Sequence, residues 1–318
     1  MGGLRRFDGL QSIASRTPGC VAAIGNFDGV HVGHQDVFSA AIGRSLDMGR
    51  PCMVVTFDVH PALHLRPGEA PGVIMTLKDR LTIIAGMGVN EALVLPFDRD
   101  LASRSPEDFS REVLVKGLGA RQVVAGEGWR FGRDRSGDMD RLAELGRDLG
   151  FGVTKVPAAA YGGLPVSSTR IRGALDRGDV NLARNLLGRP HFVRGSVARG
   201  EGRGRELGYP TVNLECGDLL LPSRGVYAGG FSFEGHVGPA AVNIGRRPTF
   251  GSGPTTIEAH LSGMEENLYG KEITVFFLAR LRDEHPFPDR ETLKAQIGRD
   301  VERSKQSFSP SAARGIPL

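Results

Sequence analysis

The sequence has few cysteines and no long apolar run. Its 318 residues include three cysteines, Cys20, Cys52 and Cys216, whose scattered positions match neither a zinc site nor a disulfide framework. A reducing compartment is therefore expected. No apolar stretch reaches the roughly 18 residues of a membrane-spanning helix, and the first residues lack the apolar core of a secretory signal. We expect a cytoplasmic protein with no membrane partner.

A strong excess of charge is also missing. Lys and Arg number 40 against 36 Asp and Glu, which gives a net charge of +4, and the basic residues form no dense block. A patch for small anions such as phosphates fits this balance, and no nucleic-acid partner is expected. The chain is long enough for two domains. These features give no indication of the oligomeric state.

The pattern of apolar residues changes once along the chain. Up to about residue 186, short apolar runs alternate with segments of helical spacing, which predicts a doubly wound parallel α/β sheet. In such sheets ligands bind beyond the carboxyl ends of the strands. From His191 to about Leu281, short strands separated by Gly, Pro and Asn predict a small antiparallel β-barrel, closed by a helix that starts at Asp289. We expect domains at residues 1–186 and 187–308 and a disordered tail at 309–318.

Two histidines stand where the strand CVAAIGNF turns into a helix. His31 and His34 follow the turn at residues 25–29, and Gly29 and Gly33 let a ligand approach the backbone closely. Backbone N–H groups and the positive end of the helix dipole point at this strand end. Imidazoles there can donate hydrogen bonds to phosphate oxygens. A packed turn and a zinc site are the alternatives, although the nearby sequence offers no third zinc ligand.

Two further segments of the first half carry arginines. In PVSSTRIRGAL, one of Ser167, Ser168 and Thr169 is expected to cap a helix, with Arg170 and Arg172 in its first turn. Cations oppose the positive end of the helix dipole, so we expect an anion between them, with triphosphate the natural candidate. GEGWRFGRDRSGD is either a surface loop or a lid over a nucleotide or an aromatic ring.

The barrel half contains a second candidate site. RGEGRGRELGYPTVNLE offers backbone amides and cations for phosphates, and Thr211 and Asn213 offer oxygen ligands of the kind that Mg²⁺ prefers. Glu258 lies in a strand with apolar neighbours, and His260 is expected on the same side of that strand. The Glu258 carboxylate is either solvated on the outer face or a general base, and the spacing leaves both open.

Together these motifs resemble the family of bifunctional prokaryotic riboflavin kinases/FAD synthetases. The matching segments extend from about Thr17 to Ser304 and are GNFDGVHVGH, TFDVHP, RFGRDRSGD, VSSTRIR, GRELGYPTVNL, GVYA, NIGRRPTF, IEAHL and NLYGKEI. The resemblance implies a Rossmann-like nucleotidylyltransferase domain followed by a riboflavin kinase barrel. It also implies that riboflavin is phosphorylated to FMN with ATP and Mg²⁺. A second ATP then adenylylates FMN to FAD, with release of pyrophosphate.

The resemblance implies a role for each candidate residue. In the kinase, Glu258 takes the proton of the riboflavin 5′-hydroxyl, Thr211 and Asn213 hold the metal, and the expected ATP-binding residues are Gly200, Gly202, Arg205, Gly208 and Pro210. In the adenylyltransferase, His31 and His34 stabilise the α-phosphate of ATP. The other expected ATP-binding residues are Gly25, Asn26, Phe27, Asp28, Gly29, Ser167, Ser168, Thr169 and Arg172. The flavin-binding residues of this half are expected to be His60, Pro61, Trp129 and Phe131.

One departure from the family pattern concerns the second activity. Gly128, in GEGWRFG, stands where the family commonly has an acidic or amide residue. An alternative function is therefore a riboflavin kinase with an impaired adenylyltransferase domain. A third interpretation is a non-catalytic flavin- or RNA-binding regulator. The candidate catalytic residues argue against it, because binding alone does not need all of them.

Overall fold

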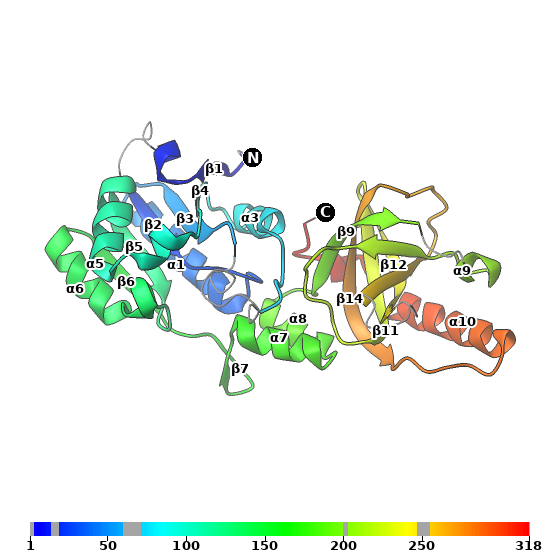
Figure 1. The fold of residues 1–318 in the computed structure, drawn as a ribbon. Coiled ribbons are helices and arrows are strands. Elements are labelled where there is room, and N and C mark those ends of the chain that lie inside the picture. Colours follow the sequence, from blue (N-terminus) through cyan, green and yellow to red (C-terminus); the bar gives the residue numbers. More distant parts are fainter. Residues whose placement is uncertain (1–2, 14–18, 60–70, 200–202, 247–254, 318) are drawn as a thin grey trace. The chain divides into compact units, whose positions relative to one another are not determined.

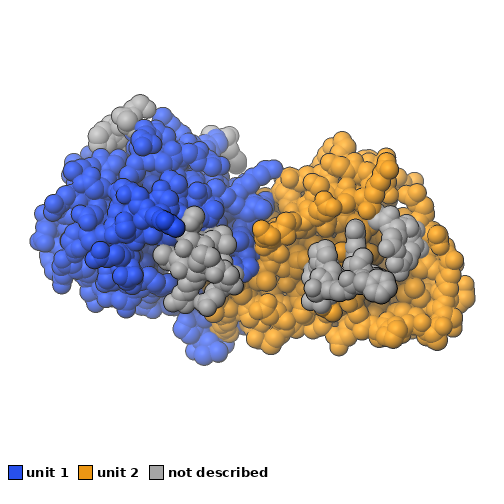
Figure 2. All heavy atoms as spheres, viewed as in Figure 1, with its two compact units in different colours: residues 1–167 blue, residues 168–318 orange. Residues whose placement is uncertain are grey.

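A computed structural model describes residues 3–13, 19–59, 71–199, 203–246 and 255–317. Within it the chain divides into two compact units, Met1–Ser167 and Ser168–Leu318; Figure 2 colours them separately. Four of the candidate residues, His60, Pro61, Gly200 and Gly202, lie outside the described residues.

Unit 1 is built on a six-stranded parallel sheet (Figure 1). Its strands, in chain order, are β1 (Arg5–Asp8), β2 (Cys20–Ile24), β3 (Cys52–Phe57), β4 (Glu91–Leu95), β5 (Ala120–Gly126) and β6 (Gly152–Val156). β2 and β3 are buried along their whole length, as expected for inner strands of a parallel sheet covered on both faces. The predicted α/β fold is confirmed, and β1, which the sequence analysis did not predict, adds an edge strand.

The α-helices of unit 1 each start after a residue whose side chain caps the helix. The helices of this unit are α1 (Val32–Asp47), α3 (Leu77–Gly86), α4 (Arg99–Ser103), α5 (Pro106–Asp108), the π-helix η2 (Phe109–Gly117), α6 (Met139–Leu149) and the 3₁₀-helices η1 (Leu10–Ile13) and η3 (Arg133–Arg135). Ser105 accepts a hydrogen bond from the Asp108 amide, and Pro106 occupies the first helical position. A short antiparallel hairpin, β7 (Ala160–Tyr161) and β8 (Leu164–Pro165), follows β6.

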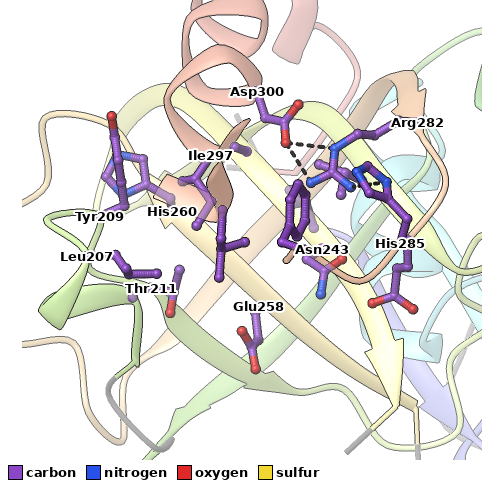
Figure 3. A pocket seen from close by; sticks show the side chains of 17 residues that line it. Leu207, Tyr209, Thr211, Asn243, Glu258, His260, Arg282, His285, Ile297 and Asp300 are labelled. Atoms are coloured by element: carbon purple, nitrogen blue, oxygen red, sulfur yellow. Dashed lines mark hydrogen bonds and ion pairs between the residues drawn. The ribbon is translucent and has the colours of Figure 1, made fainter. Parts of the chain in front are cut away.

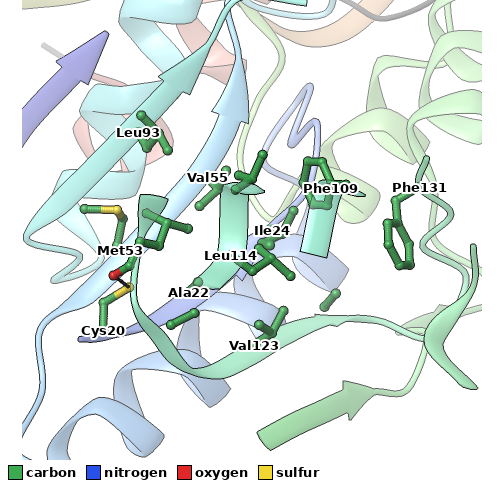
Figure 4. Packing of buried hydrophobic residues seen from close by; sticks show 14 of the residues in the cluster. Cys20, Ala22, Ile24, Met53, Val55, Leu93, Phe109, Leu114, Val123 and Phe131 are labelled. Atoms are coloured by element: carbon green, nitrogen blue, oxygen red, sulfur yellow. Dashed lines mark hydrogen bonds between the residues drawn. The ribbon is translucent and has the colours of Figure 1, made fainter. Parts of the chain in front are cut away.

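The hydrophobic core of unit 1 joins the sheet to the π-helix. Figure 4 shows Ile24 and Val123 from neighbouring strands beside Leu114 of η2, with Phe109 and Phe131 also in the cluster. Ile24, Val123 and Leu114 are each at most 1% exposed. Full burial stabilises each such side chain by about 1.5–3 kcal/mol. The core therefore provides a rigid base for the loops at the carboxyl ends of the strands.

The strand order, β1-β4-β3-β2-β5-β6, places a topological switch point between β2 and β5. From β2 the chain adds β3 and then β4 on one side, whereas β5 pairs with the other edge of β2. Doubly wound sheets bind ligands outside the carboxyl ends of the strands at such a point. The loops after β2 and β5 are therefore the structurally favoured ligand-binding loops of this unit.

Unit 2 contains the predicted antiparallel barrel, closed in the order β10-β13-β12-β11-β14-β9. Its strands are β9 (Phe192–Ala198), β10 (Val212–Glu215), β11 (Gly225–Phe233), β12 (His236–Arg246), β13 (Thr255–Leu261) and β14 (Glu272–Arg282). Its helices are α7 (Ser168–Asp176), α8 (Val180–Leu187), α9 (Arg203–Glu206) and α10 (Arg290–Ser307). Asp289 caps α10, as predicted. In the described parts of the chain, no helix has the length and apolar character needed to cross a membrane.

The expectation of a disordered tail at 309–318 is wrong for the described residues. Pro310–Ala313 form the 3₁₀-helix η4, and Ala313 and Ile316 are only 4% and 6% exposed. The Pro317 carbonyl accepts a hydrogen bond from Arg194 Nη2 at 2.9 Å. The tail is ordered because Ala313 and Ile316 are buried and the Pro317 carbonyl is hydrogen-bonded to Arg194 of the barrel.

Candidate active sites

His31 and His34 lie together at the carboxyl end of β2, where α1 begins. His31 is the N-cap residue of α1, and its Nδ1 accepts a hydrogen bond from the His34 amide at 3.3 Å. The two imidazole rings stack with their centroids 3.5 Å apart and 17° between their planes. With Nδ1 accepting, a neutral His31 ring carries its hydrogen on Nε2 and can donate it to a phosphate oxygen. The structure thus places two imidazoles at a helix end that favours anions.

The turn before the histidines has a strained backbone. Phe27 and Val30 have φ values of +53° and +41°, a region that bulky side chains rarely adopt. A Cβ on Gly25 would stand 2.8 Å from the Phe27 ring, so glycine is needed there. The Phe27 ring also meets the His34 ring edge-on, with centroids 5.2 Å apart. Strain of this kind persists only where the surrounding structure enforces it, and it is common at functional sites.

Buried charged groups hold this turn in place. The carboxylate of Asp28, which is 1% exposed, accepts hydrogen bonds from the Ile74 and Met75 amides at 3.1 and 3.3 Å. Arg80 is 3% exposed, and burial lowers the pKa of its guanidinium while the Asp28 carboxylate opposes that shift. Its Nη1 donates to three oxygens at the ends of β2 and β3, namely Asn26 O, Thr56 Oγ1 and Phe57 O. Asp28 therefore supports the turn rather than offering its carboxylate to solvent.

The loop after β5 contains an aromatic stack. The Trp129 and Phe131 rings are nearly parallel, with 6° between their planes and 4.7 Å between their centroids. Phe131 is 6% exposed and also contacts Phe109 of the core, whereas Trp129 is half-buried. Trp129 covers one face of Phe131 and is the more exposed of the two residues that the sequence analysis assigned to the flavin; both assignments stay predictions. Gly128 is exposed, and a Cβ there would have no heavy atom within 4 Å.

The VSSTRIR motif forms the start of α7. Ser168 and Thr169 are the first two residues of the helix, Ser167 directly precedes it, and Arg172 lies one turn further on. The hydroxyl groups therefore stand at the helix start, as predicted. The motif opens unit 2, whereas the histidine pair belongs to unit 1. Convergence of the two on one nucleotide stays a prediction.

The barrel carries a pocket of about 310 Å³ on the side of α10. Thr211, Glu258 and His260 line it, so Glu258 and His260 share a side of β13 as predicted. The Glu258 carboxylate, which the sequence left as either solvated or functional, is both exposed and part of the pocket wall. The His260 Nδ1 donates to the Pro210 carbonyl at 2.9 Å, which ties β13 to the PTVN segment.

Three neighbouring strands place polar side chains in one row. Glu258 of β13 pairs in register with Asn213 of β10 on one side and with Asn243 of β12 on the other. Residues in register on adjacent strands point to the same face of a sheet. The Asn213 amide oxygen, the Glu258 carboxylate and the nearby Thr211 hydroxyl are hard oxygen donors that fit Mg²⁺. Arg205 lies in the short helix α9, and Gly208 follows two residues after its end; both are exposed.

The opposite side of the pocket was not predicted from the sequence. Figure 3 shows Asp300 of α10 beside Arg282, and Ile297 of the same helix nearer to His260, both across the pocket from Glu258. Leu293, Ile297 and Asp300 follow a spacing of four and three residues, which places them on one face of α10. The spacing of these three residues in the sequence could have indicated that they share one face of the helix. The remaining lining residues are Gly204, Leu207, Tyr209, Val226, Ala241, Val242, Asn243, Glu284, His285 and Phe287.

Known proteins match both units in succession. The FAD synthetase family matches residues 13–170 and the riboflavin kinase family matches residues 187–308. The bifunctional riboflavin kinase/FMN adenylyltransferase of Pseudomonas fluorescens is 38% identical over 307 residues, or 96% of this chain and 98% of the relative. Its counterpart in Escherichia coli (strain K12) is 35% identical and covers 91% of this chain and 93% of the relative. A crystal structure described as a macrolide-efflux protein from Streptococcus pneumoniae superposes with a TM-score of 0.86 and 29% identity, over 96% of this chain and all of that one.

The fold and the two sites define a class of two-part proteins that join a Rossmann-like FAD synthetase domain to a riboflavin kinase barrel. Within that class, the chain belongs to the family of bifunctional riboflavin kinases/FMN adenylyltransferases. The resemblance seen in the sequence is thereby confirmed. The presence of both domains supports the bifunctional interpretation over a kinase with an impaired second half.

Proposed function

We propose that this chain phosphorylates riboflavin to FMN in the barrel and adenylylates FMN to FAD at the edge of the parallel sheet. The observation that carries the first activity is the pocket of unit 2. Glu258 and Thr211 lie on its wall, and the apolar side chains of α10 line it as well. A carboxylate next to an apolar cleft of about 310 Å³ suits a substrate with a hydroxyl at one end and an aromatic ring at the other.

In the kinase reaction, Glu258 takes the proton of the riboflavin 5′-hydroxyl, whose oxygen attacks the γ-phosphorus of ATP, and ADP leaves. Thr211 and Asn213 would hold Mg²⁺, since their oxygens are donors of the right kind beside the carboxylate of Glu258. Mg²⁺, when bound, neutralises the charge of the transferred phosphoryl group. The remaining ATP contacts are assigned to the segment that precedes β10, with Arg205, Gly208 and Pro210 among the described residues.

In the adenylyltransferase reaction, a phosphate oxygen of FMN attacks the α-phosphorus of the second ATP, and pyrophosphate leaves. His31 and His34 donate hydrogen bonds to the α-phosphate as its negative charge grows in the transition state. The FMN phosphate is ionised at neutral pH, so the site acts by positioning and electrostatics without a general base. Trp129 contacts the flavin, with Phe131 beneath it. The other ATP contacts are assigned to Gly25, Asn26, Phe27, Asp28, Gly29, Ser167, Ser168, Thr169 and Arg172; among these, Asp28 acts by holding the turn.

We also propose functional domains at residues 1–186 and 187–308 and a cytoplasmic location. The two family matches, 13–170 and 187–308, support the boundary. Cys20, Cys52 and Cys216 form no disulfide within the described part of the chain, which supports a reducing compartment. The partners of this function are the small molecules ATP, riboflavin and FMN, and we propose no nucleic-acid partner.

The test is a product assay that separates the two reactions. The purified protein is incubated with ATP and Mg²⁺, first with riboflavin and then with FMN as the only flavin, and the flavins are separated by chromatography. We expect FMN and FAD from riboflavin, FAD from FMN, and neither product when EDTA removes Mg²⁺. Absence of both products would refute the proposed function. FMN without FAD would refute only the adenylyltransferase half.

A further inference from the structure

An ion pair forms part of the pocket wall at a distance from the proposed chemistry. Arg282, in the last position of β14, and Asp300, on α10, both line the pocket whose other side holds Glu258 (Figure 3). Arg282 Nε and Nη2 donate to Asp300 Oδ2 at 3.0 and 2.8 Å. The side chains are only 18% and 4% exposed. The pair is therefore largely desolvated, unlike an ordinary surface salt bridge.

Asp300 connects this pair to the apolar face of α10. Its Oδ1 accepts a hydrogen bond from Gln296 Nε2 at 2.9 Å, so both carboxylate oxygens are used. Asp300 lies on the same helix face as Leu293 and Ile297, the apolar residues that α10 contributes to the pocket. The contacts that hold Asp300 in place therefore also set how α10 is rotated about its axis, with this apolar face toward the barrel.

Arg282 connects the same pair to the segment between β14 and α10. Its Nη1 donates to the Asp283 carbonyl at 3.0 Å and approaches His285 Nδ1 at 3.5 Å. Its guanidinium lies over the Phe287 ring, 5.5 Å from the centroid. His285 and Phe287 also line the pocket. One guanidinium thus holds three parts of the wall together, namely the end of β14, the segment 283–289 and α10.

A buried ion pair of this kind contributes little to the stability of the fold, but it fixes the orientation of its two partners relative to each other. The cost of burying two charges largely offsets their attraction, and an apolar pair of similar volume often stabilises a fold as well or better. A forked guanidinium–carboxylate contact, however, is directional, which an apolar contact is not.

We propose that Arg282 and Asp300 are positioning residues for the flavin ring. They hold α10 and segment 283–289 at the separation that admits the ring between α10 and the barrel, and they determine riboflavin affinity and not the rate of phosphoryl transfer at Glu258. This inference rests on the proposed riboflavin kinase activity of the barrel.

The experiment compares variants of the full-length protein. Asp300→Asn removes the negative charge of the pair, and Arg282→Lys replaces the forked guanidinium by a single ammonium group. In the double variant Arg282→Met/Asp300→Leu an apolar contact replaces the pair. Asp283→Asn is the matched control, because Asp283 pairs with Arg280 of β14 at 2.7 Å, is 83% exposed, and is not among the described residues that line the pocket. Each protein is measured for the KM of riboflavin, the KM of ATP, kcat, riboflavin binding without ATP by flavin fluorescence, melting temperature and adenylylation of FMN.

We expect Asp300→Asn to raise the KM and Kd of riboflavin about tenfold, the effect of losing one charge-assisted contact, with kcat, the KM of ATP and FMN adenylylation within about twofold. Arg282→Lys is expected to lie between this variant and wild type. The double variant is the decisive one: its melting temperature returns to the wild-type value while its riboflavin KM stays raised. The control is expected to match wild type.

Three results would overturn the inference. They are an unchanged riboflavin KM in both single variants, a fall in kcat with riboflavin KM unchanged, and a double variant whose riboflavin KM recovers together with its stability. If Asp300→Asn does not fold, Arg282→Lys and the double variant decide the matter. A wild-type protein that forms no FMN from riboflavin would refute the proposed function itself, before any variant is compared.

Discussion

Lowering the pH from 7.5 to 5 is expected to destabilise the barrel through one buried histidine. His191 precedes β9 and is 2% exposed; its Nε2 donates to the Leu220 carbonyl at 2.9 Å, and its ring stacks on Phe277. Burial lowers its pKa from 6.5 to about 4; the hydrogen bond to Leu220 opposes that shift, and the charge of Arg189 adds to it. The folded barrel therefore keeps His191 neutral in a pH range where the unfolded chain protonates it.

The sign and the size of the effect follow from these two pKa values. At pH 7.5 and above the histidine is largely neutral in both states and contributes little pH dependence. As the pH falls from 6.5 toward 4, the unfolded state binds a proton that the folded state does not, so stability is lost. Each unit of pH in that window costs up to about 1.4 kcal/mol, which amounts to about 2 kcal/mol by pH 5 and about 3 kcal/mol by pH 4.

The measurement must report the unfolding of the barrel separately from the unfolding of unit 1. Urea unfolding at pH 5 to 7.5, followed by pulsed hydrogen exchange and mass spectrometry of peptides from β9 and β14, meets this need. His191→Gln keeps a donor for the Leu220 carbonyl but cannot be protonated, so its barrel stability is expected to lose about 2 kcal/mol less than wild type between pH 7.5 and 5. His236→Gln, which changes an exposed histidine of β12, is expected to keep the wild-type slope. Equal slopes for wild type and His191→Gln would show that the folded barrel accepts the proton, and the reasoning would fail.

The remaining predictions concern the two active sites, each of which controls for the other. Glu258→Gln keeps the size of the side chain but removes the base, so the rate of riboflavin phosphorylation is expected to fall about 100-fold or more. The rate of FMN adenylylation, measured by the product assay with FMN as the only flavin, is expected to stay unchanged. His34→Ala is expected to lower FMN adenylylation about 100-fold and leave riboflavin phosphorylation intact. His31→Asn retains a good N-cap, so a similar loss of adenylylation with an unchanged melting temperature would separate phosphate binding from capping. A Cβ added at Gly128 would meet no heavy atom within 4 Å, so Gly128→Asp is expected to fold normally and to raise the rate of FAD formation from FMN. An unchanged or lower rate would contradict the importance of that position.

Local patterns predicted the elements that carry both sites. The Ser105-Pro106 helix start, the Asp289 cap of α10 and the strand–turn–helix around His31 appear in the structure as the sequence indicated. These features depend on the geometry of a few adjacent residues, which the sequence contains directly. The shared side of Glu258 and His260 follows in the same way from the alternation of side chains along a strand.

What the sequence alone determined, then, is the identity of most of the main elements, the two-part organisation and the residues at the strand ends. Tertiary structure decided which elements meet. The switch point depends on β5 pairing with β2, the polar row depends on Asn213 and Asn243 flanking Glu258, and the pocket wall depends on α10 bringing Asp300 to Arg282. The physical reason is that these partners are brought together by packing and hydrogen bonds between residues far apart in the chain, which no local pattern encodes. The same long-range packing orders the tail, whose short sequence carries no local sign of it.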